Sequence, residues 1–251
     1  MQVVGYHARV EAPAALVLAA DGAVTVEPLD PGTELGYALG DRHCAGTVDG
    51  DHHDACEHAD APYCPEHTSR WPCARCTGDC RKPIAACDAE HAVYLAAFAP
   101  DTVKVGVTRS WRLSTRLREQ GADRAAHLRT VDDGRIARQV EADIAAALGD
   151  RVRVPTKIDG FGDSIDESFW SKLCAEYDPL ETFTFDSGLG LTERPLPETL
   201  ATGTVRGAKG RVVVLDNGGS TYAIDLRNLV GHELTDGGTD RDLQSSLGAF
   251  D

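Results

Sequence analysis

Residues 91–110 read HAVYLAAFAPDTVKVGVTRS and carry the clearest structural pattern in the chain. Two short apolar runs, at residues 93–99 and 103–107, stand on either side of a Pro100-Asp101 turn. Apolar runs of this length, separated by turn residues, are typical of paired β-strands. We therefore predict a β-hairpin here.

A short helix follows the hairpin. Ser110 can cap its N-terminus, and Gly121 marks the point before which it ends. Leu113 and Leu117 lie one turn apart and give the helix an apolar side. We expect a third strand at residues 127–131.

Two further helices are predicted after that strand. Asp132 or Asp133 opens the longer one, and Gly149 ends it. Ser164 and Glu167 form a capping box at the start of the other. The buried stripe of the longer helix is expected to be Ile136, Val140, Ile144 and Leu148.

Both ends of the chain are predicted to form short strands. We expect them at residues 3–9, 14–19, 24–29 and near 35–39, and again at 202–206, 211–215 and 221–226. The turns include Asp21-Gly22 and Asp216-Asn217-Gly218-Gly219, the second of which is a strong hairpin signal. The two ends are similar in length and turn chemistry, which fits either two halves of one sheet or chance.

These patterns predict an α+β protein. A zinc-binding loop segment would pack against a small mixed sheet with helices, with β-rich flanks at both termini. The expected parts are a β-rich segment at 1–40, a cysteine-rich zinc-binding segment at 41–90, an α/β module at 91–185, a linker at 186–199, a small β segment at 200–236 and a loose tail at 237–251.

Seven of the eight cysteines fall between residues 44 and 87, where apolar periodicity is almost absent. The spacings Cys64-x-x-His67 and Cys73-x-x-Cys76 let two ligands reach one ion through a tight turn. Seven thiolates and one imidazole complete two tetrahedral shells. We assign one zinc ion to Cys44, Cys56, Cys64 and His67, and the other to Cys73, Cys76, Cys80 and Cys87.

Several alternatives remain open at the metal segment. A neighbouring histidine (His43, His52, His53 or His58) can replace a cysteine in the first set. An iron–sulfur cluster also uses four thiolates, although the histidine favours zinc. Four protein ligands leave no open position, so we expect structural zinc. Cys174 stands apart in a helix and is expected to be a small buried hydrophobe.

The overall charge is strongly negative. Forty acids stand against 25 bases, which gives −15, and the acids are spread over the whole chain. A salt-rich cytoplasm explains this composition, and a positively charged partner is the alternative. The apolar run at residues 14–20 is far below the roughly 20 residues that span a bilayer, and no signal peptide is evident. We therefore expect a cytoplasmic protein with no membrane association.

The segment from Lys104 to Glu141 reverses this charge. It holds nine bases and five acids, a formal charge of +4, so the rest of the chain carries −19. A local positive surface is what phosphate binding requires. Arg112 and Arg116 lie one helical turn apart and can reach one phosphate backbone. With them, we expect Arg109 and Arg118 to bind nucleic acid.

Two resemblances lie in this region. Val93-Tyr94-Leu95, then Lys104-Val105-Gly106-Val107-Thr108, then Arg116 and Glu141 resemble the GIY-YIG nuclease superfamily. Residues 44–148, with Trp71 and the second cysteine set, also resemble an uncharacterised domain-of-unknown-function family of prokaryotes. In that family a zinc-binding segment precedes the same module.

The nuclease resemblance implies metal-dependent hydrolysis of phosphodiesters by the module at 91–185. It implies Tyr94 as the tyrosine of the first strand, Arg116 as the arginine that stabilises developing charge, and Glu141 as the carboxylate for Mg²⁺ or Mn²⁺. Gly106 matches the glycine of the second motif. Lys104 stands where the superfamily has a tyrosine; a lysine can contact phosphate but matches the usual base poorly. The predicted catalytic residues are Tyr94, Lys104, Arg116 and Glu141.

Other readings of the same residues stay open. Tyr94 can be a half-buried strand residue whose hydroxyl is bonded to a backbone group. Arg116 and Glu141 can form a salt bridge between two helices. In function, the alternative to an endonuclease is a non-catalytic zinc module for RNA, the ribosome or another protein, and a redox or metal sensor with labile thiols is a third. The sequence does not distinguish DNA from RNA, nor does it fix the oligomeric state.

Overall fold

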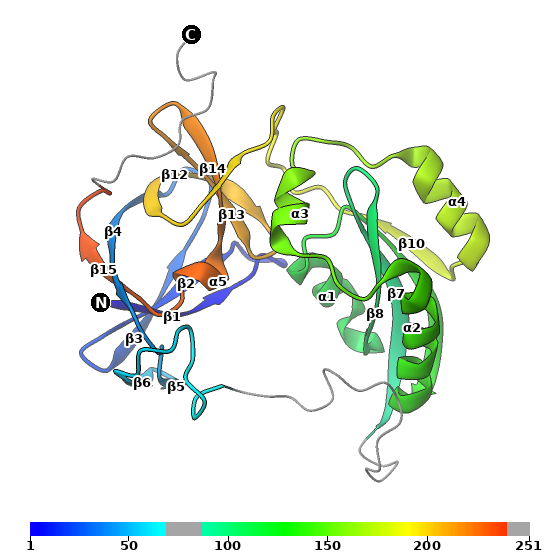
Figure 1. Ribbon diagram of the computed structural model, residues 1–251, viewed down its shortest axis with the longest axis horizontal. Coiled ribbons are helices and arrows are strands. Elements are labelled where there is room, and N and C mark those ends of the chain that lie inside the picture. Colours follow the sequence, from blue (N-terminus) through cyan, green and yellow to red (C-terminus); the bar gives the residue numbers. More distant parts are fainter. Residues whose placement is uncertain (69–86, 240–251) are drawn as a thin grey trace. The chain divides into compact units, whose positions relative to one another are not determined.

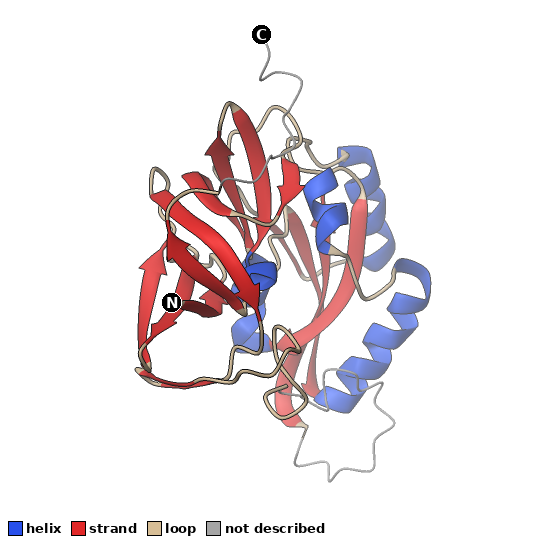
Figure 2. Cartoon of the chain, turned by 60° about the vertical axis from the view of Figure 1, so that its left-hand side comes forward, coloured by secondary structure: helices blue, strands red, loops and turns tan. Residues whose placement is uncertain are grey.

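A computed structural model describes residues 1–68 and 87–239 of the chain (Figure 1). The chain divides into two compact units. The flanking unit joins Met1–Ser69 to Ser187–Asp251, and the central unit comprises Arg70–Asp186. Strands outnumber helices in the described residues (Figure 2), so the α+β prediction is confirmed at this level.

The flanking unit is built on one 11-stranded sheet, in the order β11-β14-β13-β12-β4-β15-β1-β2-β3-β6-β5. Strands from both ends of the chain therefore alternate within a single sheet. Its elements are β1 (Gln2–His7), β2 (Ala15–Ala20), β3 (Ala23–Pro28), β4 (Glu34–Arg42), β5 (Thr47–Asp49), β6 (His52–Asp54), β11 (Leu196–Glu198), β12 (Ala201–Lys209), β13 (Val212–Asn217), β14 (Ser220–Asp225), the short helix α5 (Leu226–Leu229) and β15 (His232–Asp236).

Two tight turns in this sheet match the sequence signals. Asp21 and Gly22, between β2 and β3, both have positive φ. Gly218 and Gly219, between β13 and β14, also both have positive φ. This is the backbone of the two-residue turn whose twist matches paired strands, so both predicted turns are confirmed.

The segment predicted as a linker at 186–199 contains regular structure. Its residues from Ser187 onward belong to the flanking unit, and β11 pairs with β14 in parallel. Leu189 is buried. The tail expected at 237–251 lies outside the described residues from residue 240 on.

The central unit holds a four-stranded sheet in the order β10-β9-β7-β8. Its strands are β7 (Asp88–Phe98), β8 (Thr102–Arg109), β9 (Arg124–Asp133) and β10 (Glu181–Thr184), and each pairs with its neighbour in antiparallel fashion. The predicted hairpin is confirmed, because β7 and β8 pair from Phe98↔Thr102 to His91↔Arg109. Both strands are longer than their apolar runs suggest.

Helices cover both faces of this sheet. Val93, Leu95 and Ala97 of β7 pack with α2 (Gly134–Leu148) and α4 (Glu167–Tyr177). Alternate residues of the same strand, Ala92 to Phe98, pack with α1 (Leu113–Glu119). The period of two in a strand puts neighbours on opposite faces, so β7 is apolar from Ala92 to Phe98, where both faces are covered. A short helix, α3 (Val154–Asp159), follows α2.

Three helix predictions need correction. Ser110 begins a 3₁₀ turn, Ser110–Arg112, and α1 starts only at Leu113. The capping box at Ser164 is not formed: the carboxylate of Asp166 accepts from the amides of Ser168 (2.8 Å) and Phe169 (3.1 Å), so α4 begins at Glu167. An aspartate next to the first turn provides this cap directly.

The third correction concerns the buried stripe of α2. Val140, Ile144 and Leu148 do pack against the core, but Ile136 is 51% exposed and Ala137 is 0% exposed. Ala137 lies three residues before Val140, so the stripe runs through spacings of three as well as four. Asp133 caps α2, because its carboxylate accepts hydrogen bonds from the amides of Arg135 and Ile136. Of the two aspartates predicted to open this helix, Asp133 is therefore the one that does.

Among the described residues, no helix combines the length and the apolar character needed to cross a membrane.

The corrected stripe predicts opposite effects at adjacent positions of α2. Ile136→Ala should change the free energy of unfolding by less than about 1 kcal/mol, because the side chain is exposed. Ala137→Leu should destabilise by roughly 1–3 kcal/mol, because it inserts methylenes into a packed layer. Urea unfolding of the two variants measures both values. A larger loss of stability in Ile136→Ala than in Ala137→Leu would show that Ile136, as first predicted, belongs to the buried stripe.

Candidate metal centre and a charged cluster

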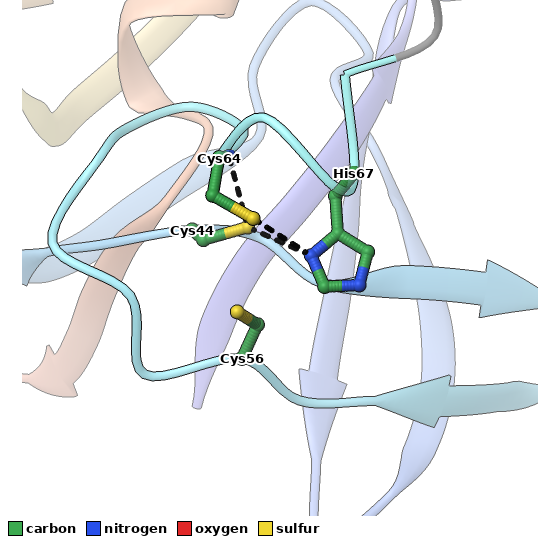
Figure 3. Close-up of side chains that lie close together, drawn as sticks. All are labelled: Cys44, Cys56, Cys64 and His67. Carbon is green, nitrogen blue, oxygen red and sulfur yellow. Dashed lines mark hydrogen bonds between the residues drawn. The ribbon is translucent and has the colours of Figure 1, made fainter.

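Four ligand groups converge in the loops that follow β4 and β6. The ligand atoms of Cys44, Cys56, Cys64 and His67 all lie within 4.8 Å of one another (Figure 3). His67 Nδ1 is 3.3 Å from the sulfur of Cys44 and 3.2 Å from that of Cys64. The structure thus brings together the first predicted set, and the group can hold a metal ion such as zinc.

The spacing of these atoms suits a tetrahedral zinc ion. Zinc lies about 2.3 Å from sulfur and about 2.0–2.1 Å from nitrogen, which places ligand atoms roughly 3.5–3.8 Å apart. The shortest separation between these ligand atoms is 3.2 Å, and none exceeds 4.8 Å, so the expected distances fall within the observed range. Three soft sulfurs and one imidazole are the donor set that zinc prefers.

Local hydrogen bonds hold the ligand loops in place. The carbonyl of Cys64 accepts from the amides of His67 (3.1 Å) and Thr68 (2.9 Å), which closes the turn between the two ligands. The sulfur of Cys44 accepts from the amides of Cys64 (3.3 Å) and Gly46 (3.4 Å). Gly46 has φ +63°, and a Cβ there would lie 2.0 Å from the carbonyl oxygen of Asp54, so only glycine fits.

The same amide groups favour a thiolate at Cys44. Burial raises the pKa of this thiol, but hydrogen bonds from the backbone of Cys64 and Gly46 lower it, and the net pKa is below the ordinary value. A metal ligand must be deprotonated, so the environment of Cys44 suits metal binding before any ion is considered.

The neighbouring histidines are not among the four ligand groups that converge, and each has a partner elsewhere. His43 Nδ1 lies 2.9 Å from the carbonyl of Cys56, and His53 Nε2 lies 2.9 Å from the carbonyl of Ala45. His52 pairs with Asp54, and His58 accepts from the amide of Asp60. His43 and His53 therefore support the loops that carry the ligands.

The second predicted set falls mostly beyond what the structure describes. Cys73, Cys76 and Cys80 lie in residues 69–86, outside the described residues. Cys87 is described, and its carbonyl accepts from the amide of Gly134 at the start of α2 (3.0 Å). The second zinc site stays a prediction.

We predict that the first set binds one zinc ion per chain. Cys56→Ser should lower the zinc content by about one equivalent and weaken the flanking unit towards urea, because loss of a metal removes binding free energy from the folded state. Cys174→Ser is the matched control, since Cys174 lies on α4 away from this group. Elemental analysis of the purified variants measures the zinc. Equal zinc in all three proteins would contradict the site.

Of the predicted catalytic residues, Tyr94, Lys104 and Arg116 come from the face of the central sheet that α1 covers, whereas Glu141 lies on α2, which covers the other face. Tyr94 pairs with Gly106 across the hairpin, and a Cβ at Gly106 would lie 2.6 Å from the Tyr94 hydroxyl. The ring therefore lies over the glycine, which explains the residue at that position. Tyr94 is 2% exposed, and its hydroxyl accepts from Gln120 Nε2 (2.7 Å).

Lys104 lies on the same face as Tyr94, because it pairs with Ala96, two residues further along β7. Its ammonium group is 3.4 Å from the carbonyl of Asp150. Burial and the positive charge of Arg116 lower the pKa of Lys104 to about 8, although Glu141 and Asp150 oppose the shift.

Arg116 and Glu141 do not form the helix–helix salt bridge considered above. Arg116 pairs with Glu119 on α1 (3.1 Å), and Arg112 pairs with the same carboxylate (2.9 Å). Glu141 pairs with Arg138 on α2 (2.6 Å), and its side chain is 13% exposed. Arg112 and Arg116 thus converge on a carboxylate that lies between them.

The four residues nevertheless form one electrostatic group, which we call the charged cluster: Tyr94, Lys104, Arg116 and Glu141. Burial raises the pKa of Tyr94, Arg116 opposes the rise, and Glu141 adds to it. Arg116 and Glu141 also act on Lys104. Both α1 and α2 lie next to the edge strand β8 (Figure 1).

The residues predicted to bind nucleic acid have different surroundings. Arg112 is held by Glu119, and the guanidinium of Arg118 lies 5.2 Å from the centre of the Phe185 ring. Arg109 is exposed at the end of β8. The sequence reasoning missed Gln120, which binds the Tyr94 hydroxyl, because nothing in its local pattern indicates a partner in β7.

The pKa of Lys104 predicts a pH-dependent stability. The folded chain binds this proton less tightly than the unfolded chain, whose lysine has a pKa near 10.4, so stability rises as the pH rises from about 8 to 10.4. Relative to Lys104→Met, the wild type should gain of the order of 1–3 kcal/mol over this interval. Urea unfolding of both proteins at several pH values measures the difference. A constant difference would show that the amine is not desolvated.

Comparison with known families gave one match. The model of the family described as "Protein of unknown function (DUF2797)" matches residues 52–182, just over half of the chain. This range includes Cys56, Cys64 and His67 of the metal group and all of the charged cluster. Comparisons with curated proteins and with solved structures gave no significant match.

Proposed function

We propose that this chain, which belongs to the DUF2797 family of unknown function, is a zinc-stabilised nucleic-acid-binding protein. Its central unit would hydrolyse phosphodiesters. The observation that carries this proposal is the charged cluster. Four side chains of the types used in GIY-YIG nucleases come from β7, β8, α1 and α2, and the charges of Arg116 and Glu141 both act on the pKa of Tyr94 and of Lys104. A scaffold alone does not require a lysine, an arginine and a glutamate around a buried tyrosine.

The cluster can bind the phosphate through its cations. Arg116 has a side chain that is 46% exposed, so its guanidinium can reach a phosphate oxygen outside the unit. Lys104 adds a second positive charge on the same face whenever its amine is protonated. Positive groups placed where negative charge develops are the main source of rate in phosphoryl transfer.

Hydrolysis also requires a base. Water attacks the phosphorus, the bond to the leaving oxygen breaks, and the proton of the water passes to the base. With its pKa near 8, the amine of Lys104 is partly neutral around that pH and can accept the proton. Tyr94 stays protonated because burial raises its pKa, so we assign it to positioning through Gln120.

Glu141 is the residue that would hold Mg²⁺ or Mn²⁺. It offers one carboxylate, of which one oxygen binds Arg138, so water and the phosphate itself would have to complete the shell. When bound, such an ion offsets charge on the phosphate. The Cys44, Cys56, Cys64 and His67 group is assigned to structural zinc, since its four protein ligands leave no open position.

A second candidate function is a non-catalytic zinc module that binds nucleic acid. The Glu141–Arg138 ion pair favours this second function, because a carboxylate already paired with an arginine is a weaker metal ligand. The presence of Lys104 in place of the superfamily's tyrosine points the same way. The two functions differ in one respect: only the enzyme needs the carboxylate of Glu141 for turnover.

The test is a cleavage assay on supercoiled plasmid and on labelled RNA and DNA oligonucleotides, with Mg²⁺ or Mn²⁺. Glu141→Gln should lower the rate by about 100-fold or more, because it removes the proposed metal carboxylate. Asp143→Asn is the matched control: it removes one acid from the exposed side of α2 and should leave the rate within about two-fold. Circular dichroism verifies the fold of both.

Each outcome has a distinct meaning. Loss of cleavage in Glu141→Gln with unchanged binding supports the enzyme. Binding by the wild type without cleavage under any metal condition supports the second candidate. Absence of both binding and cleavage rejects the proposal.

A further inference from the structure

Trp111 is an unusual surface residue. It is 77% exposed, more than any other large hydrophobic side chain of the described residues. Its position is the 3₁₀ turn Ser110–Arg112, between the end of β8 and the start of α1. A single exposed apolar side chain is common on protein surfaces, so the case for a partner rests on the residues around Trp111.

The surroundings of Trp111 identify the chemistry of that partner. Arg109 precedes it by two residues, and the guanidinium of Arg112 lies 5.9 Å from the centre of its ring. Arg116 follows one turn later on α1 and belongs to the charged cluster. An exposed aromatic ring among arginines offers a flat apolar surface for a base and positive charge for its phosphates.

We propose that Trp111 is a stacking platform for an unpaired base, so that the substrate of the central unit is single-stranded nucleic acid. This inference rests on the proposed function and specifies its substrate class. Bases inside a duplex cover one another's faces, and an indole on a protein surface can stack only on a base that is unpaired or splayed out. Stacking tolerates any base, so the platform selects strandedness and not sequence.

The position of Trp111 also fits the path proposed for a bound nucleic-acid strand. Arg112 and Arg116 are one helical turn apart on the side of α1 that bears Glu119, and Trp111 stands directly before them. A phosphate backbone bound by these two arginines would pass next to the turn Ser110–Arg112, because Arg112 belongs to that turn. Stacking there would hold the neighbouring phosphate close to the charged cluster.

The test is binding, measured without added Mg²⁺ or Mn²⁺ so that it is independent of cleavage. Fluorescence anisotropy with a labelled single-stranded oligonucleotide of about twelve nucleotides, as RNA and as DNA, gives the affinity. A blunt duplex of the same sequence is the second probe. Trp111→Ala should weaken single-strand binding by about 5- to 150-fold and duplex binding by less than about two-fold. Trp111→Phe should retain most of the affinity.

Leu180→Ala is the matched control. Leu180 is 64% exposed in the same unit, so the variant removes a comparable apolar surface, and single-strand affinity should not change. The intrinsic fluorescence of the wild type should also be quenched by the oligonucleotide more strongly than that of Trp111→Phe, which assigns the contact to this indole.

The result separates the two proposals. If the wild type binds and Trp111→Ala binds equally well, the platform is wrong and the proposed function stands. If the duplex loses as much affinity as the single strand, the selection of unpaired bases is wrong. If the wild type binds neither the single-stranded oligonucleotides nor the duplex, both proposals fail.

Discussion

The strand β7 is the constraint on which the central unit depends. It lies inside the sheet, and from Ala92 to Phe98 it is covered on both faces, so both side-chain rows of this part are apolar. Tyr94 is the exception, with a hydroxyl in an otherwise apolar row. A buried hydroxyl needs a partner, and Gln120 at the end of α1 provides it. The position of α1, and with it Arg116, is therefore tied to the register of β7.

The flanking sheet has an apolar core of its own, but the loops that carry the metal group do not. The loops from Cys44 to Thr68 bury few apolar side chains, among them Ala45, Cys44 and Cys64. Long loops with so small a core lose more conformational entropy than burial returns. Ligands from three separate loop positions meet at one point, and an ion bound there would contribute directly to folding.

Some of this architecture could be predicted from local pattern. The hairpin, the two-residue turns and the first ligand set depend on residues close in sequence, where spacing has a direct geometric meaning. The strand β15 was missed because it depends on pairing with β1 and β4 at the far end of the chain. The stripe of α2 was misplaced at Ile136 because a small alanine at position 137 lets the helix approach the sheet, and alanine gives a weak hydrophobic signal.

The sequence alone was also insufficient to predict which arginines near the charged cluster are free of a carboxylate partner. The formal +4 of residues 104–141 already includes Glu119, but that carboxylate pairs with both Arg112 and Arg116, so these two arginines are not free charges. Exposed ion pairs of this kind contribute about 0–1 kcal/mol, so a phosphate can replace the carboxylate at little cost. The chain as a whole, at −15, repels a polyanion at long range. The proposed binding of nucleic acid therefore requires short-range contacts, and stacking on an exposed indole is a contact that net charge does not oppose.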